Sequence, residues 1–445
     1  MKRAISLIIT LALVLALLPV PARAASNAYG SDVWLRDTVL QEGVTYSENI
    51  FWSGSYSKPR HEYYFTYTPG IGTGLSSAWS GQDPLPGTDA GQIPSWILPE
   101  GSQSADDSQP EPDGGISAGA FNDAYPGVQT GVRPVASYGG SVCGRTTAGE
   151  AAAKYESQGY RVVGAINGDF YDTSTGYPLG ILVSGGEVLS GSSEYYAIGF
   201  RADGTAVIGY PNLSIVASSG TSSLKLASLN KPRVSKAGVT MLTYDYRDDH
   251  TTGSSVASDG VNVLANIVGG KAAIGGELFL QVTEVAEDAQ VRTLAENQAL
   301  LTVDVNGYTE GVAFLRSLTP GTVVSVSITS PDASWSQVTE AIGAYDLLVK
   351  DGRVTDGLEA GAAPRTAVGV KANGDVVFYT IDGRQDSVSM GASKTVLAQR
   401  MIELGCIAAV NLDGGGSTTA VASMPDGSRR HAEQYPQRQE PANGQ

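Results

Sequence analysis

The stretch AAVNLDGGGSTTAV, residues 408–421, joins an apolar run to two polar side chains, three glycines and three hydroxyl groups. The run ends on Asn411 and Asp413, and residues 414–416 are all glycine. A tight turn after a buried strand would explain this composition, because glycine adopts the backbone conformations that turns require. A ligand cradle would explain it as well, because glycine N–H groups can approach an anion while the carboxylate stands at its edge.

A second stretch, AINGD at residues 165–169, resembles AVNLD at residues 409–413. Each stretch follows a predicted helix, a glycine and a strand of buried character. The first helix is predicted over residues 147–159, where a capping box opens it and a glycine ends it. The second is predicted over about residues 393–405 from the helical spacing of its apolar side chains.

The two strands are expected to bring an amide and a carboxylate each to one pocket. Ligands of sheets with helical crossovers gather beyond the carboxyl ends of the strands. We therefore predict that Asn167 and Asp169 face Asn411 and Asp413 there. Chance is the alternative explanation, because ANGD at residues 372–375 repeats part of the pattern in what reads as a hairpin turn.

The first 24 residues have the pattern of a secretory signal peptide. Lys2 and Arg3 precede an apolar segment over residues 4–18, and the small-x-small sequence at residues 22–24 resembles a signal-peptidase site. The apolar segment is shorter than the roughly 20 residues that cross a bilayer, and no later segment reaches that length. We expect a secreted or cell-envelope protein with no membrane span after removal of the signal.

The mature chain is expected to be strongly acidic. Loss of Lys2, Arg3 and Arg23 with the signal, which holds no acidic residue, takes the net charge from −16 to −19. Such a chain repels nucleic acid and anionic membranes at long range, so neither is an expected partner. An anionic substrate would therefore require cations that are concentrated locally.

Cysteine and histidine are too scarce for a disulfide scaffold or a zinc enzyme. Cys143 and Cys406 are the only cysteines, and either one disulfide or two free thiols is compatible with the sequence. The three histidines are scattered and form no HExxH motif.

The pattern of the whole chain predicts an α+β fold, with β-rich mixed sheets and a few helices in a single catalytic domain that carries an irregular insertion. Residues 28–75 read as N-terminal strands that join the main domain. Residues 76–130 read as a Gly/Pro/Ser/Asp-rich insertion or linker. Short strands with Asp-Gly turns recur in the main domain, residues 131–425, and residues 426–445 are expected to be a disordered tail.

The hairpin around residues 373–374 suggests a cluster of charged groups. If these two residues form the turn, the strand register places Arg365 opposite Asp382, with Arg384 nearby. A surface ion pair of small energetic value is the ordinary explanation. The functional explanation is a pair of guanidinium groups for an anion, one of them held by Asp382.

The motif NLDGGGST, with AINGDFYD, PRTAVG and IDGR, resembles the phosphodiester glycosidase family over about residues 133–424. The resemblance implies hydrolysis of a sugar joined through its anomeric carbon to a phosphodiester, with release of free sugar and a phosphomonoester. By position, the motif residues of the family fall on Asn167, Asp169, Arg365, Asp382, Arg384, Asp413, Gly414, Gly415, Gly416, Ser417 and Thr418.

The chemistry of that reaction suits these residues. An oxocarbenium-like transition state requires a nearby carboxylate, and phosphate oxygens require hydrogen-bond donors. The catalytic residues are predicted to be Asp413, Asp169, Asn167 and Asp382. Which aspartate is the nucleophile or base stays open. The substrate- and phosphate-binding residues are predicted to be Arg365, Arg384, Asn411, Gly414, Gly415, Gly416, Ser417 and Thr418.

Two other functions are compatible with the sequence. A divalent-metal phosphodiesterase would cleave the P–O bond with Asp169 and Asp413, joined by Asp172 and Asp382, as oxygen ligands; a divalent cation is the one cofactor considered. A non-catalytic protein could instead bind cell-wall material or another glycan on the same scaffold. The leading hypothesis is the hydrolase, acting on sugar phosphodiesters of cell-wall or exopolysaccharide material. The sequence predicts no oligomeric state.

Overall fold

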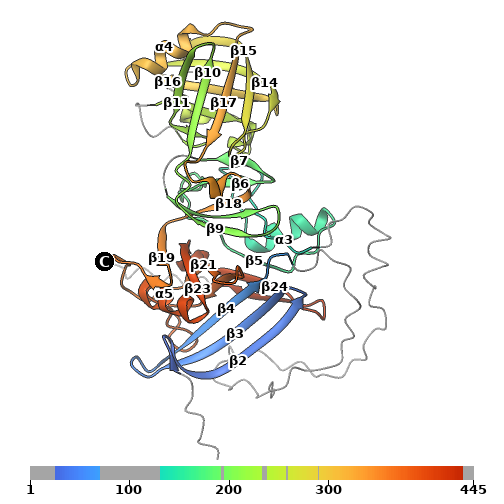
Figure 1. Ribbon diagram of the computed structural model, residues 1–445, viewed down its shortest axis with the longest axis vertical. Coiled ribbons are helices and arrows are strands. Elements are labelled where there is room, and N and C mark those ends of the chain that lie inside the picture. Colours follow the sequence, from blue (N-terminus) through green and yellow to red (C-terminus); the bar gives the residue numbers. More distant parts are fainter. Residues whose placement is uncertain are drawn as a thin grey trace, which may run out of the picture.

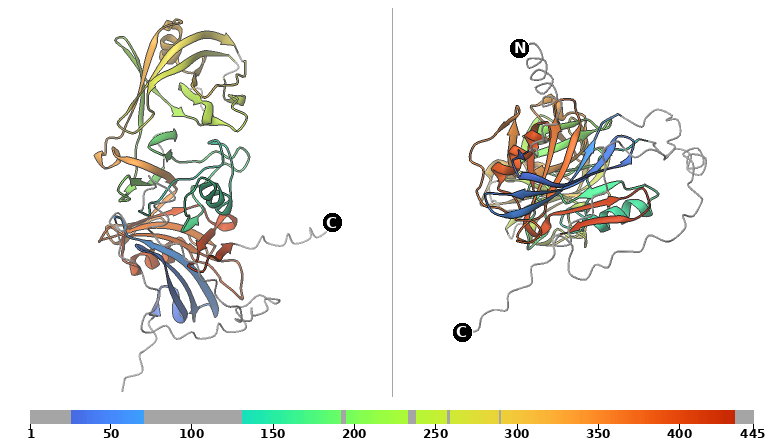
Figure 2. Two further views of the ribbon diagram at one scale, coloured as in Figure 1. Left: turned by 90° about the vertical axis from the view of Figure 1, so that its right-hand side faces the viewer. Right: turned by 90° about the horizontal axis from the view of Figure 1, so that it is seen from below.

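The computed structural model describes residues 26–70, 131–191, 195–232, 238–256, 259–288 and 290–433. The predicted signal peptide and the predicted insertion lie outside these ranges. Within them the chain forms four sheets and three α-helices, stacked in tiers along the long axis of the molecule (Figures 1 and 2). This strand-rich architecture agrees with the expected β-rich α+β class.

The lowest tier is a nine-stranded antiparallel sheet that joins the N-terminal strands to the C-terminal ones. Strand β4 pairs with β22, so segments about 310 residues apart lie side by side (Figure 1). In spatial order its strands are β1 (Ser26–Asn27), β2 (Gly30–Gln41), β3 (Val44–Ser53), β4 (Lys58–Tyr67), β22 (Val376–Ile381), β21 (Arg365–Lys371), β23 (Cys406–Leu412), β19 (Asp346–Lys350) and β20 (Arg353–Val354).

Strand β23 is buried on both faces from Ala409 to Leu412, which explains the apolar sequence there. Ala409 packs with Leu397 and Met401 of helix α5 (Lys394–Glu403), whereas Val410 and Leu412 belong to the core on the opposite face. Alternate side chains of a strand point to opposite faces, so a strand between two layers needs apolar residues throughout. The two layers fix the end of β23 in place.

The middle tier has a five-stranded sheet, and a small three-stranded sheet lies beside it. The five-stranded sheet contains β7 (Glu187–Ser190), β6 (Leu182–Ser184), β18 (Val338–Ala344), β8 (Tyr196–Arg201) and β9 (Ala206–Gly209). The three-stranded sheet contains β25 (Arg429–Glu433), β24 (Thr419–Ser423) and β5 (Gly164–Ile166), with helix α3 (Ala148–Ser157) against β5 and β24.

The upper tier is an eight-stranded sheet inserted between β9 and β18 (Figure 1). Its own apolar core continues into the five-stranded sheet below it. The elements are β11 (Ser222–Leu226), β10 (Ser214–Ser219), β17 (Val323–Thr329), β15 (Glu277–Asp288), β14 (Gly260–Gly270), β16 (Gln298–Asp304), β13 (Thr240–Thr243), β12 (Ser228–Leu229) and helix α4 (Thr309–Ser317).

Both predicted helices near the Asn-x-Asp stretches are confirmed. Helix α3 begins after Thr147, which forms the capping box with Glu150. Helix α5 begins after Ser393, whose side chain accepts a hydrogen bond from the N–H of Val396. It ends before Gly405, whose positive φ of 92° a side chain would oppose.

The predicted register of the β21–β22 hairpin is wrong by one residue. Arg365 lies opposite Ile381 rather than Asp382. The turn is longer than two residues, because the N–H of Lys371 donates to Asp375 and Gly374 adopts a φ of 91°. A shift of one residue moves a side chain to the other face of a sheet. Arg365 and Asp382 therefore lie on opposite faces.

The structure decides two further predictions, one on the C-terminal tail and one on the cysteines. The predicted tail contains a strand, because β25 pairs with β24 over residues 429–433; backbone pairing requires no apolar side chain. Cys143 and Cys406 are free thiols rather than a disulfide. Among the described residues, no helix has the length and apolar character that a membrane span requires.

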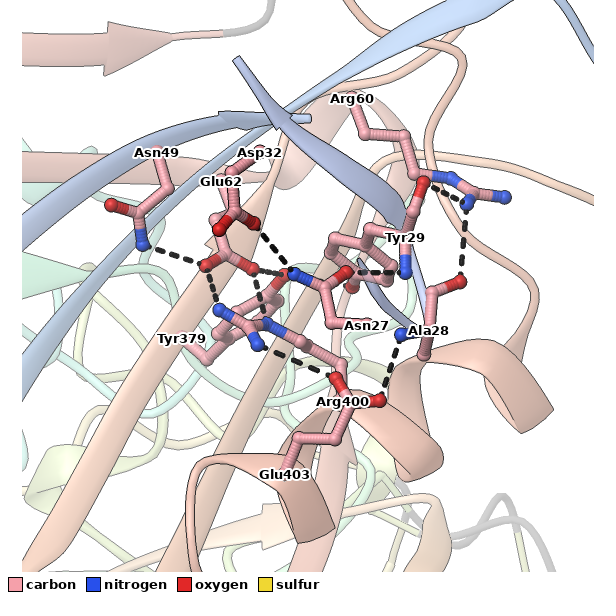
Figure 3. A network of polar contacts seen from close by, with 10 residues as sticks. All are labelled: Asn27, Ala28, Tyr29, Asp32, Asn49, Arg60, Glu62, Tyr379, Arg400 and Glu403. Carbon is pink, nitrogen blue, oxygen red and sulfur yellow. Dashed lines mark hydrogen bonds and ion pairs between the residues drawn. The ribbon is translucent and has the colours of Figure 1, made fainter. Parts of the chain in front are cut away.

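A buried polar network ties the N-terminal strands to helix α5 (Figure 3). Glu62 is fully buried and accepts hydrogen bonds from Arg400 at 2.7 and 3.0 Å, from Tyr379 at 2.7 Å and from Asn49 at 2.9 Å. A buried carboxylate is tolerated when its lone pairs are satisfied in this way. The network thus joins β3, β4, β22 and α5 into one body.

Candidate active site

The ends of β5 and β23 meet through hydrogen bonds around Asn167. Its Nδ2 donates to the backbone oxygen of Asp413 at 2.7 Å, and its Oδ1 accepts from Thr366 Oγ1 at 2.7 Å and from the N–H of Thr419 at 3.1 Å. The N–H of Asp413 donates to the carbonyl of Gly168 at 3.1 Å. The two Asn-x-Asp stretches therefore come together.

The reason for this meeting differs from the one expected. Strands β5 and β23 belong to different sheets, and each is antiparallel to its neighbours. The stretches meet because the three-stranded sheet packs over the nine-stranded one, not because they share the edge of a parallel sheet. Asn167 thereby becomes a structural joint between the sheets as well as a predicted site residue.

Asp169 is half-buried against two glycines. Its Oδ2 accepts a hydrogen bond of 2.7 Å from the N–H of Gly180. A Cβ atom on Gly343 would lie 2.4 Å from the same oxygen, so β18 can approach Asp169 this closely only because residue 343 is glycine. Burial raises the pKa of Asp169 to about 7. The hydrogen bond from Gly180 and the charge of Lys231 oppose this rise, whereas Asp413 adds to it.

Lys231 stabilises the loop that donates a hydrogen bond to Asp169, and the sequence did not predict this role. Its buried ammonium group donates to the carbonyl oxygens of Pro178, Leu179 and Gly180, each at 2.8 Å. The loop that carries the Gly180 N–H is thus held in shape by a cation. Nothing in the sequence around Lys231 signals this role, because the residue follows β12 of the inserted eight-stranded sheet.

Asp413 is also half-buried, and burial raises the pKa of its carboxyl group. Hydrogen bonds from Ser417 and from the N–H of Gly414 oppose that rise. The Gly414 N–H lies 2.9 Å from Asp413 Oδ1. Two carboxyl groups with raised pKa values thus lie at the same junction, and the charge of Asp413 contributes to the raised pKa of Asp169.

The glycine triplet forms a tight 3-10 turn, η4 (Gly415–Ser417), rather than an open cradle. The N–H of Gly415 donates to the carbonyl of Pro364 at 3.0 Å, and the N–H of Gly414 donates to Asp413 Oδ1 at 2.9 Å. Both N–H groups are therefore already engaged. Gly416 is exposed, and Thr418 is buried with its hydroxyl oxygen unpartnered. Gly416 is therefore the part of the turn that remains accessible to an anion.

The two predicted arginines gather beside this turn. Arg365 is half-buried and donates to the carbonyl oxygens of Ala392 at 3.2 Å and Gly361 at 3.1 Å. Burial lowers the pKa of Arg365, and nearby Arg384 lowers it further. The exposed Arg384 lies against Gly415. Carbonyl groups, rather than the predicted Asp382, thus orient Arg365.

Asp382 lies on the opposite face of the sheet in a separate chain of polar contacts. Tyr63 donates from its hydroxyl to Asp382 at 3.2 Å and lies 2.9 Å from Nδ1 of His61. The other ring nitrogen of His61 lies 3.1 Å from Glu48, which pairs with Arg430 at 3.3 Å. The N-terminal strands thus supply the neighbours of a predicted catalytic residue.

Asn411 faces helix α5 rather than Asn167. Its Nδ2 donates to Asp346 at 3.2 Å, and its buried Oδ1 has no partner. Asp346 also binds the buried Lys394 at 2.8 Å, and Glu359 binds Lys394 at 3.1 Å. Lys394, at the start of α5, is a further cation near the predicted phosphate-binding residues. The sequence did not predict it.

The four aspartates proposed as metal ligands do not form one group. Asp172 is partly exposed and accepts hydrogen bonds from Ser174 and Thr175 within its own turn, which lowers its pKa to about 2. Asp382 contacts Tyr63. Within the described ranges, no three His, Cys, Asp or Glu side chains are placed to hold a metal ion. The donor set of the metal-dependent alternative is therefore not assembled here.

Residues 272–443 match the model of the phosphodiester glycosidase family. The predicted resemblance is therefore confirmed. The matched range includes Arg365, Arg384, Asp382 and Asp413. Asp169 and its hydrogen-bonding loop lie before it in the sequence but reach it in space. No curated protein matches the chain.

Solved structures show the same fold at low sequence identity. A hypothetical protein from Synechocystis aligns at 19% identity over 89% of this chain, with a TM-score of 0.59, and this chain spans 61% of its length. A protein from Burkholderia pseudomallei K96243 aligns at 14% identity over 90% of this chain and 94% of its own, with a TM-score of 0.58. These likenesses concern the fold alone.

A third structure is more distant. The catalytic domain of zebrafish N-acetylglucosamine-1-phosphodiester alpha-N-acetylglucosaminidase, auto-inhibited by its pro-peptide, aligns at 14% identity over 89% of this chain and 79% of that chain. Its TM-score is 0.35.

Proposed function

We propose that this protein hydrolyses the glycosidic bond of sugar 1-phosphodiesters and releases free sugar and a phosphomonoester. The observation that carries the proposal is the meeting of Asp169 and Asp413, two half-buried carboxyl groups with raised pKa values, beside Arg365 and Arg384. Three of these four residues lie in the segment that matches the phosphodiester glycosidase family. The site of action is outside the cytoplasm, on cell-wall or exopolysaccharide material, as the signal-peptide pattern predicts.

The proposed reaction uses the two aspartates differently. Water attacks the anomeric carbon and Asp169, with a pKa of about 7, accepts its proton. The bond between the anomeric carbon and the bridging oxygen breaks, and its electron pair stays with the phosphate as the phosphomonoester. Asp413 stabilises the positive charge that develops on the sugar ring. A phosphate leaving group needs little protonation, so the site requires charge control above all.

The cations of the site suit the leaving group. Arg365 is oriented by two carbonyl oxygens, and its remaining guanidinium donors suit phosphate oxygens. Arg384 lies against Gly415, and Ser417 with its hydroxyl group ends the same 3-10 turn. In a chain of net charge −16, this local concentration of cations offsets the general repulsion of an anionic substrate.

The test is hydrolysis of a simple alkyl sugar 1-phosphodiester by the wild type and by Asp413→Asn, with product analysis. We expect free reducing sugar from the wild type and a loss of activity of at least about 100-fold in the variant. Asp426→Asn, in the exposed turn between β24 and β25, is the matched control. Equal activity of Asp413→Asn and wild type would overturn the assignment.

Two other results would support the alternative functions. Sugar 1-phosphate as the product, with loss of activity in chelator, would indicate cleavage of the P–O bond by a metal-dependent phosphodiesterase. Binding of the phosphodiester without turnover, unchanged in Asp413→Asn, would indicate a non-catalytic glycan-binding protein.

A further inference from the structure

We propose that Phe170, Tyr195 and Tyr345 form an aromatic platform that binds the pyranose ring of the substrate. The identity of this ligand as a sugar rests on the proposed function. The platform itself rests on three separate observations: the packing of the rings, their position relative to Asp169, and the charges at their edge.

The three rings pack together although they come from three separate segments. The centroid of Tyr345 lies 5.5 Å from that of Phe170, at an interplanar angle of 54°, and 5.8 Å from that of Tyr195, at 37°. Tyr345 nevertheless keeps 51% of its surface exposed. A ring supported on two sides and open on another presents a rigid aromatic surface to solvent.

The backbone holds this surface in place. Tyr195 adopts a φ of 74°, a conformation that bulky residues rarely occupy, and its N–H donates to the hydroxyl of Tyr210 at 3.0 Å. The N–H of Tyr345 donates to the carbonyl of Asn411 at 3.1 Å. The platform is thus anchored directly to the end of β23.

The position of the platform relates it to the sugar rather than to the phosphate. Phe170 follows Asp169, the proposed base, in the chain, and Tyr345 lies two residues after Gly343, which contacts the Asp169 carboxyl group. A ring bound through its anomeric carbon next to Asp169 would therefore lie over Phe170 and Tyr345. Arg384 lies against Gly415, in the turn that follows Asp413.

The chemistry of the platform suits a pyranose. The electron-rich faces of aromatic rings attract the polarised C–H groups of a sugar face, whereas hydroxyl groups at the ring edge require polar partners. Lys394 lies 5.8 Å from the Tyr345 centroid and is held there by Asp346 and Glu359. Asp346, whose side chain is 21% exposed, can accept hydrogen bonds from sugar hydroxyl groups at this edge.

The platform is tested by binding, without dependence on turnover. Saturation-transfer NMR and calorimetry with the methyl glycosides of glucose, mannose and N-acetylglucosamine measure the interaction in wild type, Tyr345→Ala and Tyr345→Phe. Tyr160→Ala is the matched control, because Tyr160 is also 51% exposed and also packs against another tyrosine. Folding of each variant is checked by its melting temperature.

We expect at least one methyl glycoside to bind, about tenfold more weakly to Tyr345→Ala and unchanged to Tyr345→Phe and Tyr160→Ala. The same glycoside preference should appear in the KM values for the phosphodiesters. Glycoside binding that depends on Tyr345 in a protein without hydrolase activity would support the platform and reject the proposed function. Active enzyme with equal binding in Tyr345→Ala and wild type, or no glycoside binding at all, would overturn the platform.

Discussion

At the scale of single residues, the environment of a carboxyl group decides what it can do. Asp169 and Asp172 are three positions apart, yet the pKa of the first rises to about 7 and that of the second falls to about 2. Asp169 is enclosed by backbone, which disfavours its charged form, whereas Asp172 is partly exposed and accepts several hydrogen bonds from its own turn. A base that works near neutral pH requires the first environment.

The raised pKa of Asp169 predicts a cost to stability at high pH. The folded-state pKa of Asp169 lies above the ordinary value of 3.8. Its contribution to the stability of the folded state is therefore fully present below pH 3.8 and is lost as the pH rises through about 7. Asp169→Asn should therefore be more stable than wild type at pH 8, by on the order of 2 kcal/mol for this half-buried group, and similar to it at pH 4.

Urea unfolding of both proteins at pH 4 and pH 8 measures this difference. Asp172→Asn serves as the control, because the lowered pKa of Asp172 predicts the opposite sign: its stabilising contribution is present above pH 3.8 and lost on acidification. A stability difference between wild type and Asp169→Asn that does not change with pH would contradict the assigned environment.

At the scale of elements, close backbone approaches shape the site more than its side chains do. Strand β18 passes so near the loop after β5 that Gly343 and Gly180 have their Cα atoms in contact range, and Asp169 fills the remaining space. Glycine is the one residue that permits this distance. The site therefore depends on two glycines that contact no substrate.

Gly343→Ala should destabilise the fold and displace Asp169. The new Cβ would lie 2.4 Å from Asp169 Oδ2 and 2.5 Å from the Cα of Gly180, so the strand or the loop must move. We expect a loss of about 1–3 kcal/mol in the free energy of unfolding and at least tenfold in kcat/KM. Gly54→Ala, which would meet no atom within 4 Å, is the control for stability and activity.

Unfolding curves and initial rates of the two glycine variants provide the measurement. A Gly343→Ala protein that matches Gly54→Ala in both quantities would show that β18 and the Gly180 loop are not in close contact.

At the scale of the whole molecule, the N-terminal strands complete a domain whose characteristic motifs lie near the other end of the chain. Strands β3 and β4 pair with the C-terminal strands through β22 and supply Glu48, His61 and Tyr63 around Asp382. The network of Glu62 and Arg400 fastens the same strands to α5 (Figure 3). The N-terminal strands thus supply the neighbours of Asp382 and part of the sheet that carries the site.

Arg400→Met should destabilise the protein by about 3–5 kcal/mol, because Glu62 would remain as a buried charge without its partner. The double variant Glu62→Gln/Arg400→Met should recover part of this loss, since no charge is then left unpaired. Arg316→Met, which breaks an exposed ion pair with Glu287, should cost less than about 1 kcal/mol. Denaturant unfolding compares the three; equal losses for Arg400→Met and Arg316→Met would contradict the importance of the buried network.

The sequence alone determined the local elements of this protein. Capping residues and glycines gave both helices near the Asn-x-Asp stretches, and apolar runs gave the strands β5 and β23, because these signals act within a few residues. The motif residues were also found from the sequence, and the stretches around Asn167 and Asp413 meet in the structure. Their catalytic and binding roles stay predictions.

Tertiary structure alone decided which groups surround those residues. Lys231 reaches Asp169 from an inserted sheet, Tyr345 reaches Phe170 from another strand, and a one-residue change of register separated Arg365 from Asp382. Contacts between distant segments depend on how sheets pack and on the register of their strands, and neither is encoded in a local pattern of residues. The motif NLDGGGST thus marked the location of the site, while packing across the sheets set the environment of its carboxyl groups.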